Sequence, residues 1–152
     1  ERLLGTFRKR IADPSADEAK KKGTSLNDLV IMASLVEEES RAGSERPIVA
    51  GILWKRLKSK IALGVDATIR YGLQKPSEAL TKTDLETVSP YNTRHSRGLP
   101  PTAIANAGES AFLAALRPEK SQYWYYLHDA DGNIHYAVTN DEHNANRAKY
   151  LR

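Results

Sequence analysis

Three consecutive glutamates close an apolar stretch at residues 26–40, LNDLVIMASLVEEES. Apolar residues in this stretch recur at the i, i+3, i+4 and i+7 spacing of an α-helix: Leu26, Leu29, Val30, Ala33 and Val36. On the helical wheel Glu37 falls within this apolar arc, whereas Glu38 and Glu39 point elsewhere. Other apolar residues cover most of the remaining circumference, so we expect a helix that is buried nearly all round: Ile31, Met32 and Leu35.

A carboxylate on the packed face of a buried helix is costly unless it is paired or protonated. Desolvation raises the pKa of a carboxyl group, and a raised pKa suits a general acid that works near neutral pH. Glu37 is therefore the candidate proton donor of this sequence. The same residue could instead mark the point where the helix emerges into solvent, and the pattern alone leaves that alternative open.

The other elements predict a fold that can position such a helix. We expect further helices near residues 1–10, 44–57, 67–73, 108–116 and 141–151, and a cap for the central helix at Thr24, Ser25 or Asn27. The segment after Asp13 is polar up to Gly23 and is expected to be a loop. Residues 89–101 contain three prolines and one glycine, which indicates a long irregular loop of the kind that often carries function.

Residues 122–139 carry the clearest β-strand pattern. Two aromatic-rich runs flank an Asp-Gly pair within DADGN, which is typical of a β-hairpin. The whole pattern predicts an α+β fold, mostly helical with a small antiparallel sheet and the catalytic Glu on a buried central helix.

Composition sets broad limits. The 152 residues are 40% hydrophobic and 28% charged, which is typical of one globular domain, and the lack of cysteine excludes disulfides and thiolate metal sites. The sequence has no signal peptide pattern and no run of 18 apolar residues. The net charge of +4 mildly favours an anionic partner, although basic clusters at 20–22 and 55–60 are typical of solvated surfaces.

Several other chemistries have weaker support. His135, Glu142 and His143 are near one another but lack the close histidine pair of a zinc-protease helix. No strand–nucleophile–helix elbow for a serine triad is visible, and the glycines are too scattered for a phosphate loop. Nucleic-acid binding would need the aromatic hairpin and the basic helix end on one surface. Glycan chemistry fits better, because aromatic rings stack on sugars and a buried Glu can protonate a glycosidic oxygen.

The sequence resembles the catalytic domain of the YceG-like, or MltG-type, endolytic murein transglycosylases between residues 26 and 151. The resemblance lies in six ordered blocks: ASLVEEES (33–40), SERPIVAGILWKRL (44–57), LGVDATIRYG (63–72), DLETVSPYNT (84–93), GLPPTAIANAG (98–108) and HYAVTNDEHN (135–144). One block alone is weak, whereas six in this order are strong.

This resemblance implies a lytic transglycosylase that cleaves peptidoglycan between N-acetylmuramic acid and N-acetylglucosamine and leaves 1,6-anhydro ends. It implies that Glu37, the first Glu of the first block, acts as general acid and then as base, with no metal or cofactor. The other blocks are expected to line the glycan cleft, with Asp66 as a supporting carboxylate: Asp66, Thr68, Tyr71, Tyr91, Asn92, Thr93, Thr139 and Glu142.

The resemblance also implies a setting. The partners would be peptidoglycan strands and cell-wall synthases of the penicillin-binding class, without nucleic acid, at the extracytoplasmic face of a bacterial membrane. Because the chain begins at Glu1 rather than Met, we expect a piece of a longer protein whose N-terminal anchor lies outside it. Residues 1–25 would then be a helix and linker, and residues 26–152 the catalytic domain.

The chain departs from the family pattern at five positions. Gly64 stands for Gln, Ala67 for Pro, Arg94 for Tyr, Thr102 for Gly and Ala107 for Pro. These changes bear on the shape of the sugar subsites. Two alternatives remain open: a muramidase-type hydrolase with the same Glu37 and a water positioned by Asp66, and a peptidoglycan-binding module without activity.

Overall fold

The computed structural model describes residues 2–7, 9, 11, 13–75 and 78–151. The helices and strands follow the chain in this order: α1 Arg2–Phe7, α2 Asp13–Lys21, α3 Leu26–Glu39, α4 Arg46–Lys58, α5 Asp66–Leu73, α6 Lys82–Glu86, α7 Glu109–Leu116, β1 Tyr125–His128, β2 Ile134–Ala137 and α8 Asn140–Tyr150. The predicted α+β class is confirmed: helices dominate, and the two strands form one small antiparallel sheet.

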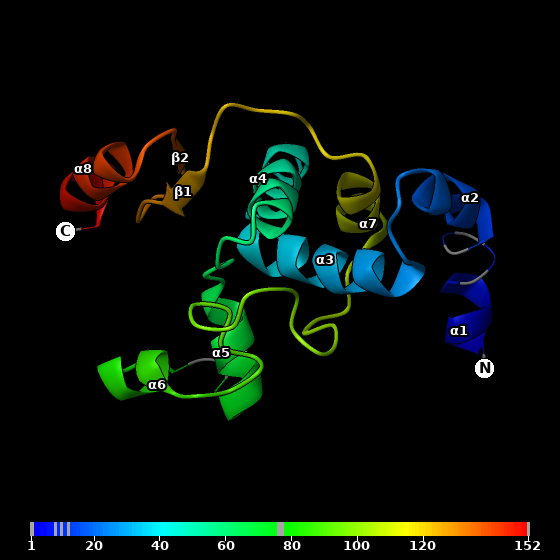
Figure 1. The fold of residues 1–152 in the computed structure, drawn as a ribbon, viewed down its shortest axis with the longest axis horizontal. Coiled ribbons are helices and arrows are strands. Elements are labelled where there is room, and N and C mark those ends of the chain that lie inside the picture. Colours follow the sequence, from blue (N-terminus) through cyan, green and yellow to red (C-terminus); the bar gives the residue numbers. More distant parts are fainter. Residues whose placement is uncertain (1, 8, 10, 12, 76–77, 152) are drawn as a thin grey trace.

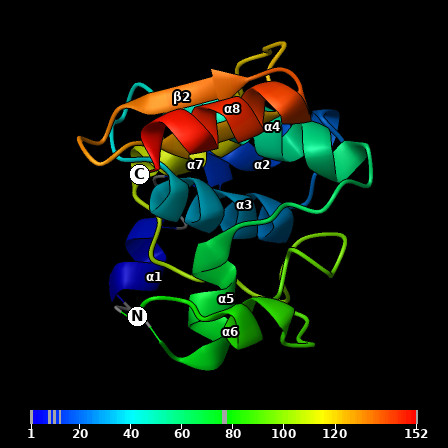
Figure 2. The same ribbon diagram turned by 90° about the vertical axis from the view of Figure 1, so that its left-hand side faces the viewer.

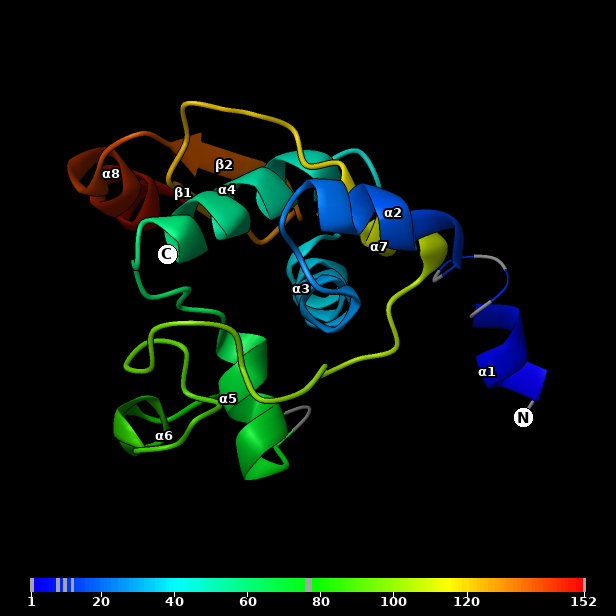
Figure 3. The ribbon, with the colours of Figure 1, turned by 45° about the vertical axis from the view of Figure 1, so that its right-hand side comes forward.

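Helix α3 lies at the centre of the molecule, with α4, the strands and α8 on one side and α5 and α6 on the other (Figures 1 and 3). Its N-terminus is capped by Ser25, whose side chain accepts a hydrogen bond from the Asp28 N–H at 3.0 Å, as predicted. Six successive residues, Ile31 to Val36, are buried, so α3 is enclosed on all sides rather than along one stripe.

The core is formed where α3, α4 and α7 pack together. Trp54 of α4 donates its indole N–H to the Ala115 carbonyl of α7 at 2.8 Å. The chain after α7 crosses directly over α4 at Gly51, where an added Cβ would lie 1.9 Å from the Glu119 carbonyl oxygen. Only glycine permits this approach, which brings α4 and the segment leading to β1 into contact.

The hairpin and α8 form a separate layer beside α4 (Figure 2). The strands pair in the register Tyr125 to Ala137 and Leu127 to His135, and the turn between them contains Gly132 at a φ of +90°. Arg56 of α4 holds this layer by donating from Nε to the Trp124 carbonyl at 2.7 Å.

One predicted loop is wrong. Residues 13–21 form α2, and Pro14 is tolerated because it stands in the first turn, where its missing N–H is not needed. The buried face of this otherwise polar helix consists of Ser15 and Ala19, four residues apart. Two small residues are too few to give a clear amphipathic pattern in the sequence. Of the helix expected at 1–10, residues 1, 8 and 10 lie outside the described residues.

No helix in the described ranges combines the length and hydrophobicity that a membrane crossing requires.

Candidate active site

A cleft of about 530 Å³ opens at the C-terminal end of α3. This end of α3 faces the space between the hairpin–α8 layer and the α5–α6 group (Figure 1). The ionisable side chains that line the cleft come from both sides: Glu39, Arg56, Asp66, Arg94, Tyr125, Tyr126, His143 and Arg147.

Glu39, the last residue of α3, is the carboxyl group at this end of the helix that lines the cleft. Its Oε2 accepts a hydrogen bond from the Tyr126 hydroxyl at 2.7 Å, whereas its Oε1 has no hydrogen-bond partner among the described residues. Burial raises the pKa of Glu39 to about 7; the Tyr126 hydrogen bond opposes this rise and the charge of Asp66 adds to it. A carboxyl group that is protonated near neutral pH and has one free oxygen is suited to general acid catalysis.

Asp66 and Arg94 form the side of the cleft opposite the hairpin. Asp66 is the first residue of α5, and its Oδ1 accepts from both Nε and Nη2 of Arg94 at 2.8 Å. Each side chain of this pair is 43% exposed. The structure therefore brings Asp66 into the same cleft as Glu39, and its role as a supporting carboxylate stays a prediction.

Glu37 lies outside this cleft. Its Oε1 accepts from Arg46 Nη2 at 2.7 Å, and its Oε2 accepts from the Gly108 N–H at 3.0 Å. The side chain is 27% exposed. The expectation of a carboxylate enclosed on the packed face is wrong for Glu37, because the residue joins α3 to α4 and to the start of α7. Both of its oxygens are occupied, whereas a general acid needs an O–H that can reach the substrate. Its catalytic role stays a prediction that the geometry does not favour.

Three predicted site residues are buried in the scaffold behind the cleft. Thr68 and Thr93 are in contact through their hydroxyl oxygens at 3.1 Å, and Thr93 Oγ1 also accepts from the Val65 N–H at 2.9 Å. The Asn92 amide donates to the Leu85 and Thr87 carbonyls at 3.0 and 2.8 Å. Their side chains therefore hold the long loop against α5 rather than face a ligand.

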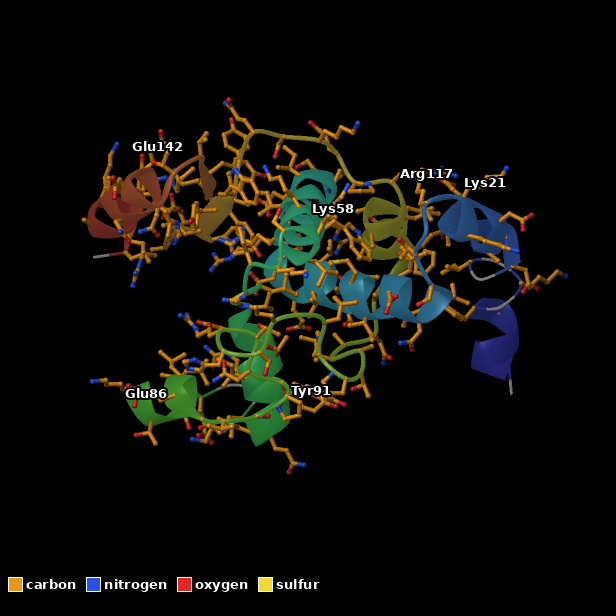
Figure 4. The ribbon with its side chains drawn as sticks, viewed as in Figure 1. Lys21, Lys58, Glu86, Tyr91, Arg117 and Glu142 are labelled. Carbon is orange, nitrogen blue, oxygen red and sulfur yellow. The ribbon has the colours of Figure 1, made fainter. Side chains whose placement is uncertain are left out.

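Two further predicted residues form the cap of α8. The Thr139 hydroxyl accepts from the Glu142 N–H at 3.2 Å, and the Glu142 carboxylate accepts from the N–H groups of Val138 and Thr139. This reciprocal pattern is a capping box. Both residues are exposed, and Figure 4 shows Glu142 at the outer side of the molecule, away from α3.

Tyr71 and Tyr91 line a second groove of about 710 Å³ beside α5, together with Glu38. Their ring centroids are 5.3 Å apart, and the Tyr91 hydroxyl is 2.9 Å from that of Thr102. Figure 4 shows Tyr91 next to α5. This groove is larger than the cleft at Glu39, but the carboxyl group that lines it, Glu38, is exposed to solvent. The chemistry is better placed at Glu39, whose pKa burial raises to about 7.

The residues considered for a metal site have other partners. The His135 ring contacts Asp129 Oδ2 at 2.8 Å through Nε2, and this hydrogen bond helps to lower the pKa of Asp129 to about 2. Glu142 belongs to the helix cap, and the His143 ring stacks on Tyr125. Within the described ranges, no three His, Asp or Glu side chains come together as metal ligands would.

Sequence reasoning missed Glu39, although one signal for it was present. Glu39 follows Leu35 by four residues and Met32 by seven, and both of these are wholly buried. The helical wheel thus supports Glu39 as well as Glu37, because every face of α3 is apolar. The contact that distinguishes them, from Tyr126, is remote in sequence and could not be read from the helix.

The chain is similar to a known protein family and to named proteins of two bacteria. It matches the model of the YceG-like family over residues 1–149. It is 41% identical over 134 residues to a Bacillus subtilis protein named endolytic murein transglycosylase, an alignment covering 88% of this chain and 37% of the relative. A protein of the same name from Streptococcus pneumoniae strain D39 is 26% identical over 157 residues, which cover 99% of this chain and 28% of that protein.

A solved structure shares the fold. The crystal structure of a YceG-like protein from Listeria monocytogenes matches with a TM-score of 0.82 and 35% identity, over 94% of this chain and 44% of the other. The chain spans less than half the length of these relatives. Since the family model covers almost the whole sequence, and the fold agrees, the predicted resemblance is confirmed and the chain belongs to the YceG-like family.

Proposed function

We propose that this chain is a lytic transglycosylase that cleaves glycan strands of peptidoglycan, with Glu39 as its general acid and base. The observation that supports this role is a carboxyl group with a pKa of about 7 at the end of a buried helix, lining a cleft. The names of the relatives, endolytic murein transglycosylases, support the substrate and the reaction.

In the proposed reaction, protonated Glu39 donates its proton to the oxygen between N-acetylmuramic acid and N-acetylglucosamine, and the bond to the muramic C1 breaks. The charge that develops at C1 is oxocarbenium-like and is stabilised by the nearby negative charge of Asp66. The 6-hydroxyl of the same muramic acid then attacks C1 and gives its proton to the Glu39 carboxylate. The products are a 1,6-anhydro end and a regenerated acid, and no water is consumed.

Tyr126 keeps one oxygen of Glu39 in place during both steps. Burial, reinforced by the adjacent Glu39, raises the pKa of the Tyr126 hydroxyl well above its usual range, so it remains a hydrogen-bond donor at neutral pH. The free Oε1 is then the atom that exchanges the proton with the substrate.

A matched pair of variants tests the assignment. Purified uncrosslinked strands are incubated with the parent chain, Glu39→Gln and Glu37→Gln, and the products are identified by mass spectrometry. We expect anhydro-muramic ends from the parent, a rate about 10²–10⁴-fold lower for Glu39→Gln, and a rate within about tenfold of the parent for Glu37→Gln. The reverse ranking would establish Glu37 as the acid instead.

The same products separate the alternative functions. Reducing ends that carry an added water would identify a muramidase-type hydrolase and contradict the lyase. Strand binding without any product would identify a binding module. The extracytoplasmic location follows from a cell-wall substrate, and the association with cell-wall synthases remains a prediction from the resemblance.

A further inference from the structure

The cleft contains more positive than negative side chains, and the positive side chains differ in how many hydrogen bonds and ion pairs they make. Arginines enter from α4, from the long loop and from α8, whereas the acidic groups are Glu39 and Asp66. Because burial raises the pKa of Glu39 to about 7, this carboxyl group is largely uncharged at slightly acid pH. The cleft therefore has a surplus of cations before any ligand binds.

Two of the three arginines are occupied by the fold. Arg56 donates to the Trp124 carbonyl at 2.7 Å and to the Leu63 carbonyl at 2.9 Å, and its guanidinium lies 4.9 Å from the Tyr125 ring centroid. Arg94 donates through Nε and Nη2 to Asp66. Both side chains thus serve as connections between elements.

Arg147 does not connect elements in this way. Its guanidinium makes no hydrogen bond or ion pair with any described residue, although it lines the cleft and is exposed. Asn140, His143 and Arg147 stand at i, i+3 and i+7 on α8 and all line the cleft, so one face of this helix presents polar groups to it. Burial lowers the pKa of His143, and the charges of Arg147 and Arg56 lower it further, so Arg147 is the cationic group of this face at neutral pH.

We propose that this face of α8 is an anion subsite, in which Arg147 binds a carboxylate of the substrate. The planar guanidinium matches a carboxylate with two parallel hydrogen bonds, and the Asn140 amide lies on the same face. The inference rests on the proposed function, because the sugars of a glycan strand are uncharged and its carboxylates belong to the muramic acid substituent. Two sources share this chemistry: the free lactyl carboxylate of a stripped strand, and the carboxylates of an attached stem peptide.

Binding without turnover tests the subsite. In a Glu39→Gln background, affinities are measured by titration calorimetry for three ligands: peptide-bearing strands, strands stripped of peptide by an amidase, and uncharged oligomers of N-acetylglucosamine. We expect Arg147→Gln to weaken binding of a carboxylate-bearing strand about tenfold and to leave the uncharged oligomer unaffected. A loss limited to peptide-bearing strands identifies the stem peptide as the source, and a loss limited to stripped strands identifies the lactyl group.

Lys149→Gln is the matched control, because it removes the same charge from the same helix at an exposed residue that does not line the cleft. Equal losses of affinity in Arg147→Gln and Lys149→Gln would mean that only the net charge of α8 matters, and would overturn the subsite. Unchanged affinity in Arg147→Gln, with the parent still cleaving strands, would overturn the subsite alone. A protein that neither binds nor cleaves any of these glycans would contradict the proposed function together with the subsite.

Discussion

Glu37 and Glu39 are two residues apart on one helix, yet their surroundings are opposite. Glu37 is fixed by a guanidinium and a backbone N–H, with both oxygens occupied. Glu39 is half-buried beside the hairpin, has one hydroxyl donor, and retains one oxygen without a partner among the described residues. The comparison teaches that burial alone does not create a proton donor. The carboxyl must be desolvated and at the same time remain incompletely paired.

After the loss of activity expected in Glu39→Gln, the largest effect expected from this difference is in the pH dependence of activity. Because the acid form of Glu39 is required and its pKa is about 7, the rate should fall about tenfold per pH unit above that value. The rate of strand cleavage, measured from pH 5 to pH 9, should therefore fall about fiftyfold between pH 7 and pH 9. A rate that is constant over this range would contradict Glu39 as the general acid.

The two glutamates should also have opposite effects on stability. The raised pKa of Glu39 means that the folded protein keeps a proton that the unfolded chain has lost, so stability falls as pH rises from about 4.5 to about 7. Glu39→Gln should thus increase the free energy of unfolding by roughly 1–3 kcal/mol at pH 8 and have little effect at pH 4.

Glu37→Gln should instead lower the free energy of unfolding by about 1 kcal/mol, because Arg46 would lose its charged partner at a partly exposed site. Urea titrations of both variants at pH 4 and pH 8 check this contrast. Destabilisation by both variants at pH 8 would mean that Glu39 is a structural residue like Glu37.

The smallest expected effect comes from the single hydrogen bond to Glu39. Tyr126 opposes the rise in the Glu39 pKa, so Tyr126→Phe should raise that pKa further. The pH at which the rate begins to fall on the alkaline side should then be higher by up to about one pH unit. Tyr123→Phe, at a neighbouring tyrosine that does not line the cleft, is the control and should leave this pH unchanged. A downward shift in Tyr126→Phe would mean that the hydroxyl favours the protonated form.

Much of the fold could be predicted from local sequence. The expected cap at Thr24, Ser25 or Asn27 and the Asp-Gly hairpin turn act through neighbouring residues, and the structure shows a cap at Ser25 and the hairpin. Helix α2 was missed because its buried face consists of two small residues, Ser15 and Ala19. Local signals succeed where local physics determines the structure.

The site was less predictable than the fold. Family resemblance led to the block that contains all three glutamates and to Asp66, but the helical wheel could not choose among faces that are all apolar. The choice depends on contacts with Tyr126 and Arg46, which are made by tertiary folding. Thr68, Asn92 and Thr93 show the converse, because buried polar side chains that satisfy the backbone have the same residue types as side chains that bind sugars.

Arg56 gives the cleft one further property. Its planar guanidinium donates to the Trp124 carbonyl, which precedes β1 on one side of the cleft. It also donates to the Leu63 carbonyl, in the connection to α5 on the other side. The separation of these two sides of the cleft thus depends on Arg56. Arg56→Lys would replace the planar guanidinium with a single ammonium, which could not donate to both carbonyls in this geometry. The two sides of the cleft would then be free to move apart.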